Sequence, residues 1–237
     1  MKTVVISQPM YFPWVGMLEQ MALADVFVHL DDVQFSKGGF FNRVQIKAPQ
    51  GVRWLTIPLA ESKLGQSLYE MHPAEHDWQR KHLATLQHVY AAAPYIDEVI
   101  ALVESVFGKN IETLAGLSAA SMEAMAQYFK VSPEMILCSS EISVDAKGSE
   151  RVLAICQSLG ATRYVTGHGG VDYLDHELFN EVGIAVEYMD YEKCEYPQLY
   201  GEFTPFVSAL DLLANCGQEG RDVIAPQTVC WKDFINE

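Results

Sequence analysis

The sequence predicts an α/β fold built on a parallel sheet. Short apolar runs, typical of buried strands, alternate with longer stretches that have the three-to-four-residue apolar spacing of helices. This alternation occurs in residues 3–30 and again in residues 134–189. Apolar residues make up 49% of the 237, which is enough for a large core. We therefore expect a Rossmann-like sheet with helices on its faces.

The first strand–helix–strand unit occupies residues 3–30. Thr3–Ser7 is short, β-branched and apolar, as buried parallel strands are. Two prolines then stiffen the loop that follows. Residues 15–24 have helical apolar spacing, and residues 26–30 form the second apolar run. A strand, a constrained loop, a helix and a second strand make one βαβ unit.

A β excursion is expected after this unit. Residues 42–47 alternate apolar and polar side chains, residues 53–59 do so more weakly, and the turn between them contains Pro and Gly. This pattern predicts an antiparallel hairpin. Residues 60–73 are polar and have no periodicity. They fit either a lid over a site or a surface loop, and the surface loop is the more common outcome.

Three helices in a row interrupt the alternation. They are predicted at residues 75–93, 95–107 and 111–129. Pro94 ends the first, and Gly108 suits the end of the second. We assign residues 74–131 to an α-helical insertion or subdomain. Residues 1–73 and 132–237 then form the α/β core with a C-terminal extension.

The second half returns to the strand and helix alternation. Strands are predicted at residues 134–138, 163–166 and 184–188, and helices at residues 149–159, 171–181 and near 206–215. A Gly-His-Gly-Gly sequence directly follows the second of these strands.

Charge and cysteine usage limit the partners and the compartment. The formal net charge of −15 argues against nucleic-acid binding, which depends on clustered Lys and Arg. A small anionic substrate remains compatible, because Lys37, Arg43, Lys47 and Arg53 form a local basic cluster. The five cysteines are odd in number and lack metal-knuckle spacing, so we expect a reduced, cytoplasmic protein. No signal-peptide pattern or membrane-spanning apolar run is present, so we expect no membrane insertion.

Polar residues gather where the first two predicted strands end. The carboxyl ends of parallel strands meet at one edge of a sheet, where open α/β sheets bind ligands. The residues expected to contact a substrate or nucleotide here are Gln8, Tyr11, Pro13, Gly16, Gln34, Asn42 and Arg43. A purely structural role in a tight strand-to-helix turn is the alternative for the proline and glycine.

Asp32, Lys37 and His82 are the candidate catalytic groups. Asp32 fits a general base or a magnesium ligand, or else a turn-capping residue. Lys37 suits binding of a phosphate or carboxylate. His82 lies on the apolar stripe of the predicted helix, where a hydrogen-bonded core histidine is more common than a catalytic one.

A second candidate site is the glycine loop that follows the strand at residues 163–166. Gly167, Gly169 and Gly170 would let backbone N–H groups point at an anion. Asp172 and Tyr173 would complete the pocket. A tight turn with a capping Asp is the alternative. We predict no metal site, because metal sites need several convergent ligands.

The motif QPMYFPWVGMLEQMALADVFVHLDDVQFSKGGFFNRVQIK at residues 8–47 resembles the WbqC-like family. The resemblance continues through WLTIPL, WQRKHLATLQHVYAAAPYI, TGHGGVDYL and EYPQLYGEFTPFVSALDLLANCG, and so covers nearly the whole chain in order. That family occurs in bacteria, often with genes for O-antigen and other surface polysaccharides. The resemblance implies a role in making or decorating such glycans.

The order of strand, loop, helix, strand and acidic loop is also similar to HIGH-type nucleotidyl transferases, such as pantothenate synthetase, which have the HUP-type Rossmann layout. Those enzymes hold ATP phosphates with an HxGH-like loop after the first strand. This chain has Phe12-Pro13-Trp14-Val15-Gly16 there, without either histidine. The likeness implies ATP with magnesium as the candidate cofactor, and the sequence itself leaves the cofactor open.

These observations predict a transferase or ligase that attaches a small acyl or aminoacyl group to an amino sugar in O-antigen biosynthesis. Its partner would be a small molecule, either a nucleotide sugar or a small carboxylate, and a homo-oligomer is compatible with the sequence. The competing hypothesis is a non-catalytic module that binds a sugar nucleotide or a partner protein in polysaccharide assembly.

Overall fold

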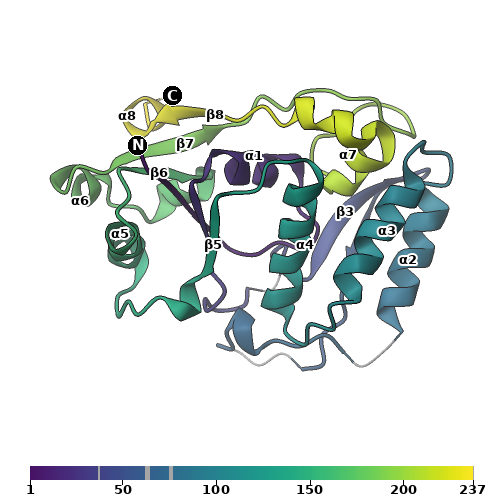
Figure 1. The fold of residues 1–237 in the computed structure, drawn as a ribbon, viewed down its shortest axis with the longest axis horizontal. Coiled ribbons are helices and arrows are strands. Elements are labelled where there is room, and N and C mark those ends of the chain that lie inside the picture. Colours follow the sequence, from purple (N-terminus) through teal and green to yellow (C-terminus); the bar gives the residue numbers. More distant parts are fainter. Residues whose placement is uncertain (37, 62–64, 75–76, 237) are drawn as a thin grey trace.

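The computed structural model describes residues 1–36, 38–61, 65–74 and 77–236, and its centre is a six-stranded sheet (Figure 1). The sheet strands are β1 (Thr3–Ser7), β2 (Val26–His29), β5 (Met135–Cys138), β6 (Arg163–Thr166), β7 (Ala185–Asp190) and β8 (Gln227–Cys230). Their spatial order is β5-β2-β1-β6-β7-β8. All neighbours pair in parallel except β8, which runs antiparallel to β7. The predicted α/β class with a parallel sheet is confirmed.

The strand order creates a reversal point in the middle of the sheet. The chain runs outward from β1 through β2 to β5, and then returns to the other side of β1 with β6 and β7. This is the order of a doubly wound Rossmann sheet, which binds ligands outside the carboxyl ends of the two strands at the reversal. Those strands are β1 and β6, which pair through Val5 and Val165 and end at Ser7 and Thr166.

Helices cover both faces of the sheet. On one face lie α1 (Val15–Leu23), α4 (Leu114–Tyr128) and α7 (Ala209–Cys216). On the other lie α5 (Gly148–Ser158), α6 (His176–Glu181) and α8 (Trp231–Phe234). Successive strand residues point to opposite faces, so Val5 packs in the first cluster while Val4 and Ile6 pack in the second.

The hairpin and the helical segment extend the first hydrophobic cluster. The hairpin is β3 (Arg43–Ala48) with β4 (Gly51–Thr56), and the remaining long helices are α2 (Trp78–Val89) and α3 (Ile96–Phe107). One continuous cluster joins Val5, Ile46, Leu86 and Val103. Figure 1 shows α2 and α3 at the end of the molecule opposite α5 and α6, with α4 between them and the sheet. The three helices therefore share a core with the sheet, and their assignment to a separate subdomain stays a prediction.

The structure differs from the sequence pattern around residues 168–181. The single predicted helix is a 3-10 helix, η3 (His168–Asp172), followed by α6. Asp175 caps α6 by accepting a hydrogen bond from the Glu177 N–H. The other short 3-10 helices are η1 (Leu68–Glu70), η2 (Ser139–Glu141) and η4 (Gly217–Val223). In the part of the chain that is described, no helix has the length and apolarity to cross a membrane.

Candidate functional site

A cavity of about 390 Å³ opens at the reversal point of the sheet, and we call it the switch-point cavity. Gln8, which follows β1, lines it together with Gly167, Gly169, Gly170 and Tyr173, which follow β6. Its volume lies within the roughly 300–1,000 Å³ range of small-molecule sites. Two segments far apart in the sequence thus meet where Rossmann sheets bind ligands. The functional roles predicted for these residues stay predictions.

The glycines of this loop differ in how closely neighbouring atoms would approach an added Cβ. A Cβ on Gly170 would lie 2.9 Å from the Thr166 methyl group, so close packing explains that glycine. A Cβ on Gly167 would lie 3.2 Å from the Tyr191 hydroxyl. A Cβ on Gly169 would meet no described heavy atom within 4 Å, and the backbone there is not left-handed. No described protein atom therefore requires glycine at 169, which borders the switch-point cavity.

The described lining of the switch-point cavity is uncharged. It contains no carboxylate, histidine, lysine, arginine or cysteine, and burial raises the pKa of Tyr173, its one ionisable group, further above neutrality. Gln20 donates a hydrogen bond to the Tyr191 hydroxyl at 2.9 Å. The exposed amide of Gln8 has no hydrogen-bond partner among the described residues. Such a lining suits a neutral, hydrogen-bonding ligand such as a nucleoside or a sugar.

The same lining fits magnesium ATP poorly. Magnesium is usually held by carboxylates, and phosphates by Arg, Lys or successive backbone N–H groups. The described part of the lining offers no carboxylate, Arg or Lys, so only the backbone N–H groups of the glycine loop remain to hold a phosphate. Across the described residues, no group of three or more His, Cys, Asp or Glu is placed to hold a metal ion.

A second, apolar cavity of about 240 Å³ lies on the other side of the loop at residues 8–14. Its lining residues are Met10, Tyr11, Pro13, Trp14, Phe40, Val44, Gln45 and Phe206. Met10 lines this apolar cavity and the switch-point cavity as well. The apolar cavity and the switch-point cavity therefore share Met10.

The loop between the cavities is held firmly by two helices. Phe12 has a left-handed backbone with φ of 40°, which is uncommon for a bulky residue. Its N–H donates to the Ser121 hydroxyl of α4 at 2.8 Å. Its carbonyl accepts from the Ser208 hydroxyl, which precedes α7, at 2.7 Å. Strain of this kind persists only where the surroundings over-determine it, as they do here.

His82 lies in the core and lines neither cavity within the described residues. Its Nε2 lies 3.0 Å from the Thr56 carbonyl oxygen, and its Nδ1 lies 3.0 Å from the Tyr11 hydroxyl. A carbonyl only accepts, so Nε2 carries the proton and Nδ1 accepts from Tyr11. Burial lowers the pKa of His82 to about 4. Its contacts are those of a neutral structural histidine, and its predicted catalytic role stays a prediction.

Asp32 is tied to α5 and η2 rather than to either cavity. Its carboxylate accepts from the Ser139 hydroxyl at 2.6 Å and pairs with the Arg151 guanidinium at 2.5 Å. Partial burial raises the pKa of Asp32, but the hydrogen bonds from Arg151 and Ser139 outweigh that effect and leave it below its usual value. A lowered pKa makes a carboxylate a weaker base, which counts against the predicted general-base role.

Among the basic residues predicted to bind an anion, the described Arg43 and Lys47 line neither the switch-point cavity nor the apolar cavity. Arg43 donates to the Gly38 carbonyl and lies 4.2 Å above the Trp54 ring. Lys47 is buried and donates to the Gln198 side-chain oxygen at 3.0 Å. Lys37 lies outside the described residues.

Other predicted site residues also have local partners. The Asn42 amide donates to the Ile57 carbonyl at 3.0 Å beside the hairpin. Gln34 forms an isolated bridge with Ser67. Asp172 lines an open hollow that shares Tyr173 with the switch-point cavity, and it does not line that cavity itself. A Cβ on Gly16 would lie 2.4 Å from the Trp14 ring, so a neighbouring side chain, rather than a ligand, explains that glycine.

Two polar residues of α1 were not singled out from the sequence. Glu19 and Gln20 are 3% and 4% exposed, and Gln20 lines the switch-point cavity. The signal was present: residues 15–23 are apolar on every side of the helix, so a polar residue among them has no solvent-facing position.

The model of the WbqC-like protein family matches residues 8–223 of this chain. The chain belongs to the WbqC-like protein family. It is 34% identical over 227 residues to the "Uncharacterized protein Rv1507c" of Mycobacterium tuberculosis (strain ATCC 25618 / H37Rv), covering 94% of this chain and 98% of that protein. No solved structure matches the chain. The family match includes both the loop after β1 and the glycine loop after β6, the two halves of the switch-point cavity.

Proposed function

We propose that the protein is an enzyme that attaches a small acyl or aminoacyl group to the amino group of an amino sugar carried on a nucleotide, in the assembly of a surface polysaccharide. The observation that carries this proposal is the pair of unlike cavities flanking Met10. The uncharged, hydrogen-bonding switch-point cavity suits a nucleoside and a sugar, and backbone N–H groups of the glycine loop would hold the phosphates between them. The apolar cavity suits the acyl group.

The chemistry of acyl transfer to an amine makes modest demands on the protein. The amine lone pair forms the new C–N bond to the acyl carbon, and the bond from that carbon to its activating group breaks. The proton lost by the amine goes to the leaving group or to water. No protein nucleophile is needed, so the contribution of the site is to hold the two reactants in line. Gln8 and Gly169, which line the switch-point cavity, would do this on the nucleotide-sugar side.

One observation favours a second candidate, a non-catalytic module that binds a sugar nucleotide. The described lining of the switch-point cavity has no side chain suited to proton transfer near neutral pH. A binding module needs the same cavity and no such group. The two candidates differ in turnover and not in binding.

A two-stage experiment tests the proposal. Calorimetry with a panel of nucleotide sugars should find a ligand, and Gly169→Leu should abolish its binding because the new side chain fills the cavity. Mass spectrometry should then detect the added acyl mass when that ligand is incubated with protein and activated acyl donors. Binding of a nucleotide sugar without product from any donor would reject the enzyme and support the non-catalytic binding module. Absence of binding by every nucleotide sugar would reject both candidates.

A further inference from the structure

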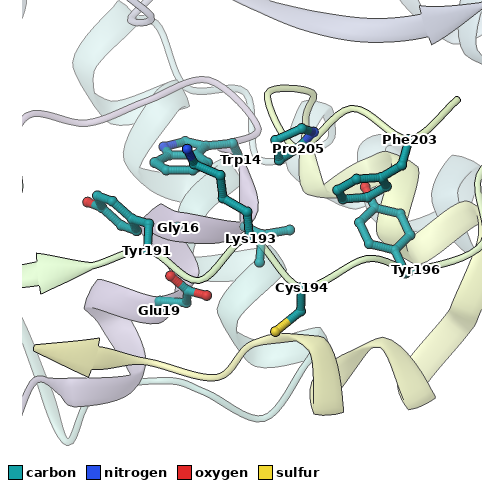
Figure 2. A pocket seen from close by; sticks show the side chains of 10 residues that line it. Trp14, Gly16, Glu19, Tyr191, Lys193, Cys194, Tyr196, Phe203 and Pro205 are labelled. Atoms are coloured by element: carbon teal, nitrogen blue, oxygen red, sulfur yellow. The ribbon is translucent and has the colours of Figure 1, made fainter.

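A small, partly open cavity lies between α1 and the chain segment that follows β7 (Figure 2). Its volume is about 20 Å³, and we call it the Glu19 cavity. The residues that line it are Trp14, Val15, Gly16, Glu19, Tyr191, Lys193, Cys194, Tyr196, Phe203 and Pro205. It shares Trp14 with the apolar cavity and no described residue with the switch-point cavity.

Glu19 is the unusual member of this lining. It is 3% exposed, and no described basic side chain lies within salt-bridge distance of it. Burial raises its pKa to about 7, opposed by a hydrogen bond with the Ala225 backbone and assisted by the charge of Glu192. A buried carboxylate without a positive partner is costly, and proteins usually pair such a group with a cation.

The walls around Glu19 are aromatic. The Trp14 and Tyr191 rings have centroids 4.9 Å apart, and the Tyr196 and Phe203 rings have centroids 5.2 Å apart in an edge-to-face arrangement. Aromatic faces attract ammonium groups, most strongly where water is excluded. The cavity thus combines one buried negative charge with two aromatic pairs.

The basic residue in the described lining, Lys193, does not fill this cavity. Lys193 lines it, but its ammonium lies 5.3 Å above the Phe206 ring. Figure 2 shows the Lys193 side chain directed away from the Glu19 carboxylate. No cation of the described chain therefore pairs with the Glu19 carboxylate.

We propose that the Glu19 cavity binds the primary ammonium group of a small ligand. A cavity must offer roughly 10–15 Å³ to hold one water, and an ammonium group is about that size. The volume of about 20 Å³ therefore admits one such group, while the rest of the ligand extends through the opening. This site stands apart from the switch-point cavity and does not depend on the function proposed for that cavity.

The test uses the full-length protein in sodium phosphate buffer without amines. Protein chemical shifts are followed by NMR at pH 8 during titration with methylammonium and with 2-aminoethanol. We expect saturable shifts of the Trp14 and Tyr191 ring signals, and none with ethylene glycol, the neutral counterpart of 2-aminoethanol. Glu19→Gln should weaken amine binding at least about tenfold, which corresponds to 1.4 kcal/mol. Glu195→Gln, which removes an exposed charge outside the lining, should leave it unchanged.

Three outcomes would overturn the proposal. Equal binding of ethylene glycol would make the cavity a general solvent pocket. Unchanged amine binding by a folded Glu19→Gln variant would show that the carboxylate takes no part in binding. Complete competition by potassium at the same concentration would make it a site for monovalent metal ions instead. Glu19→Gln and its control Glu195→Gln each remove one negative charge. Thermal unfolding of both variants shows whether Glu19→Gln is folded.

Discussion

Adjacent residues of α1 serve two cavities of opposite character. Gln20 lines the open, uncharged switch-point cavity, whereas Glu19 lines a small cavity walled by aromatic side chains. Open α/β sheets form the first kind of cavity wherever the strand order reverses. The second kind has no such topological origin, and it depends on which side chains happen to cover one carboxylate. The topology of the sheet therefore predicts the position of the switch-point cavity, but it does not predict the Glu19 cavity beside the same helix.

The largest expected effect tests the switch-point cavity. Gly169→Leu places a side chain where a Cβ meets no described atom, so it should fill the cavity without distorting the chain. We expect at least about a hundredfold loss of nucleotide-sugar affinity by calorimetry, which corresponds to roughly 2.8 kcal/mol. Ala185→Leu, an exposed change at the opposite end of the sheet strands, is the matched control. Retained affinity in a folded Gly169→Leu variant would show that the ligand lies elsewhere.

The next effect tests the Glu19 cavity through stability. The folded-state pKa of Glu19, about 7, lies above its ordinary value, so the folded protein holds this proton more tightly than the unfolded chain. This contribution to stability is complete at low pH and is lost as pH rises through about 7. Glu19→Gln should therefore raise the free energy of unfolding at pH 8 by about 1–2 kcal/mol, a value reduced for solvent screening.

Urea unfolding of both proteins at pH 4 and pH 8 checks this expectation. At pH 4, below the ordinary Glu value of 4.5, the two should be nearly equal, because Glu19 is then protonated in the folded and the unfolded state. The titratable groups beside it are Tyr191, Glu192, Lys193, Cys194 and Tyr196, and burial raises the pKa of both tyrosines and of the thiol. A destabilised variant at pH 8 would mean that Glu19 is already stabilised by a partner in the folded chain.

A smaller expected effect, on stability, tests whether Asp32 belongs to either cavity. Asp32→Asn weakens the contact with Arg151 and should lower the free energy of unfolding by about 1 kcal/mol. Nucleotide-sugar affinity should stay within about twofold, because Asp32 lines neither cavity. Calorimetry and urea unfolding measure the two quantities separately. A loss of turnover with unchanged stability and affinity would restore the predicted catalytic role.

The smallest effect concerns the loop between the switch-point and apolar cavities. Tyr11→Phe removes the hydrogen bond to His82 and should cost about 0.5–1.5 kcal/mol of stability. Tyr69→Phe, a change at an exposed tyrosine, should cost nothing measurable. Thermal unfolding checks both. If Tyr11→Phe changes the pH dependence of turnover, then His82 takes part in the reaction and the structural assignment fails.

Much of the fold follows from local pattern, because strand and helix periods are written in consecutive residues. Thr3–Ser7, the hairpin and the three successive helices lie close to their predicted positions. The helix predicted at residues 171–181 was wrong in its first half. There the glycines allow the tighter η3 turn, and Asp175 starts α6 later. The strand β8 was missed because its four residues form a strand only by pairing with β7.

By itself, the sequence determined the order of most elements and placed Gln8 and the glycine loop at the same sheet edge, because parallel strands end on the same side. The pairing of β1 with β6, which brings the two together, belongs to the tertiary structure. Only the tertiary structure decided which polar side chains remain available there. Arg151 engages Asp32, and Thr56 with Tyr11 engages His82. The segment after β7 closes over Glu19. Each of these contacts joins residues distant in the chain, and no local pattern encodes them.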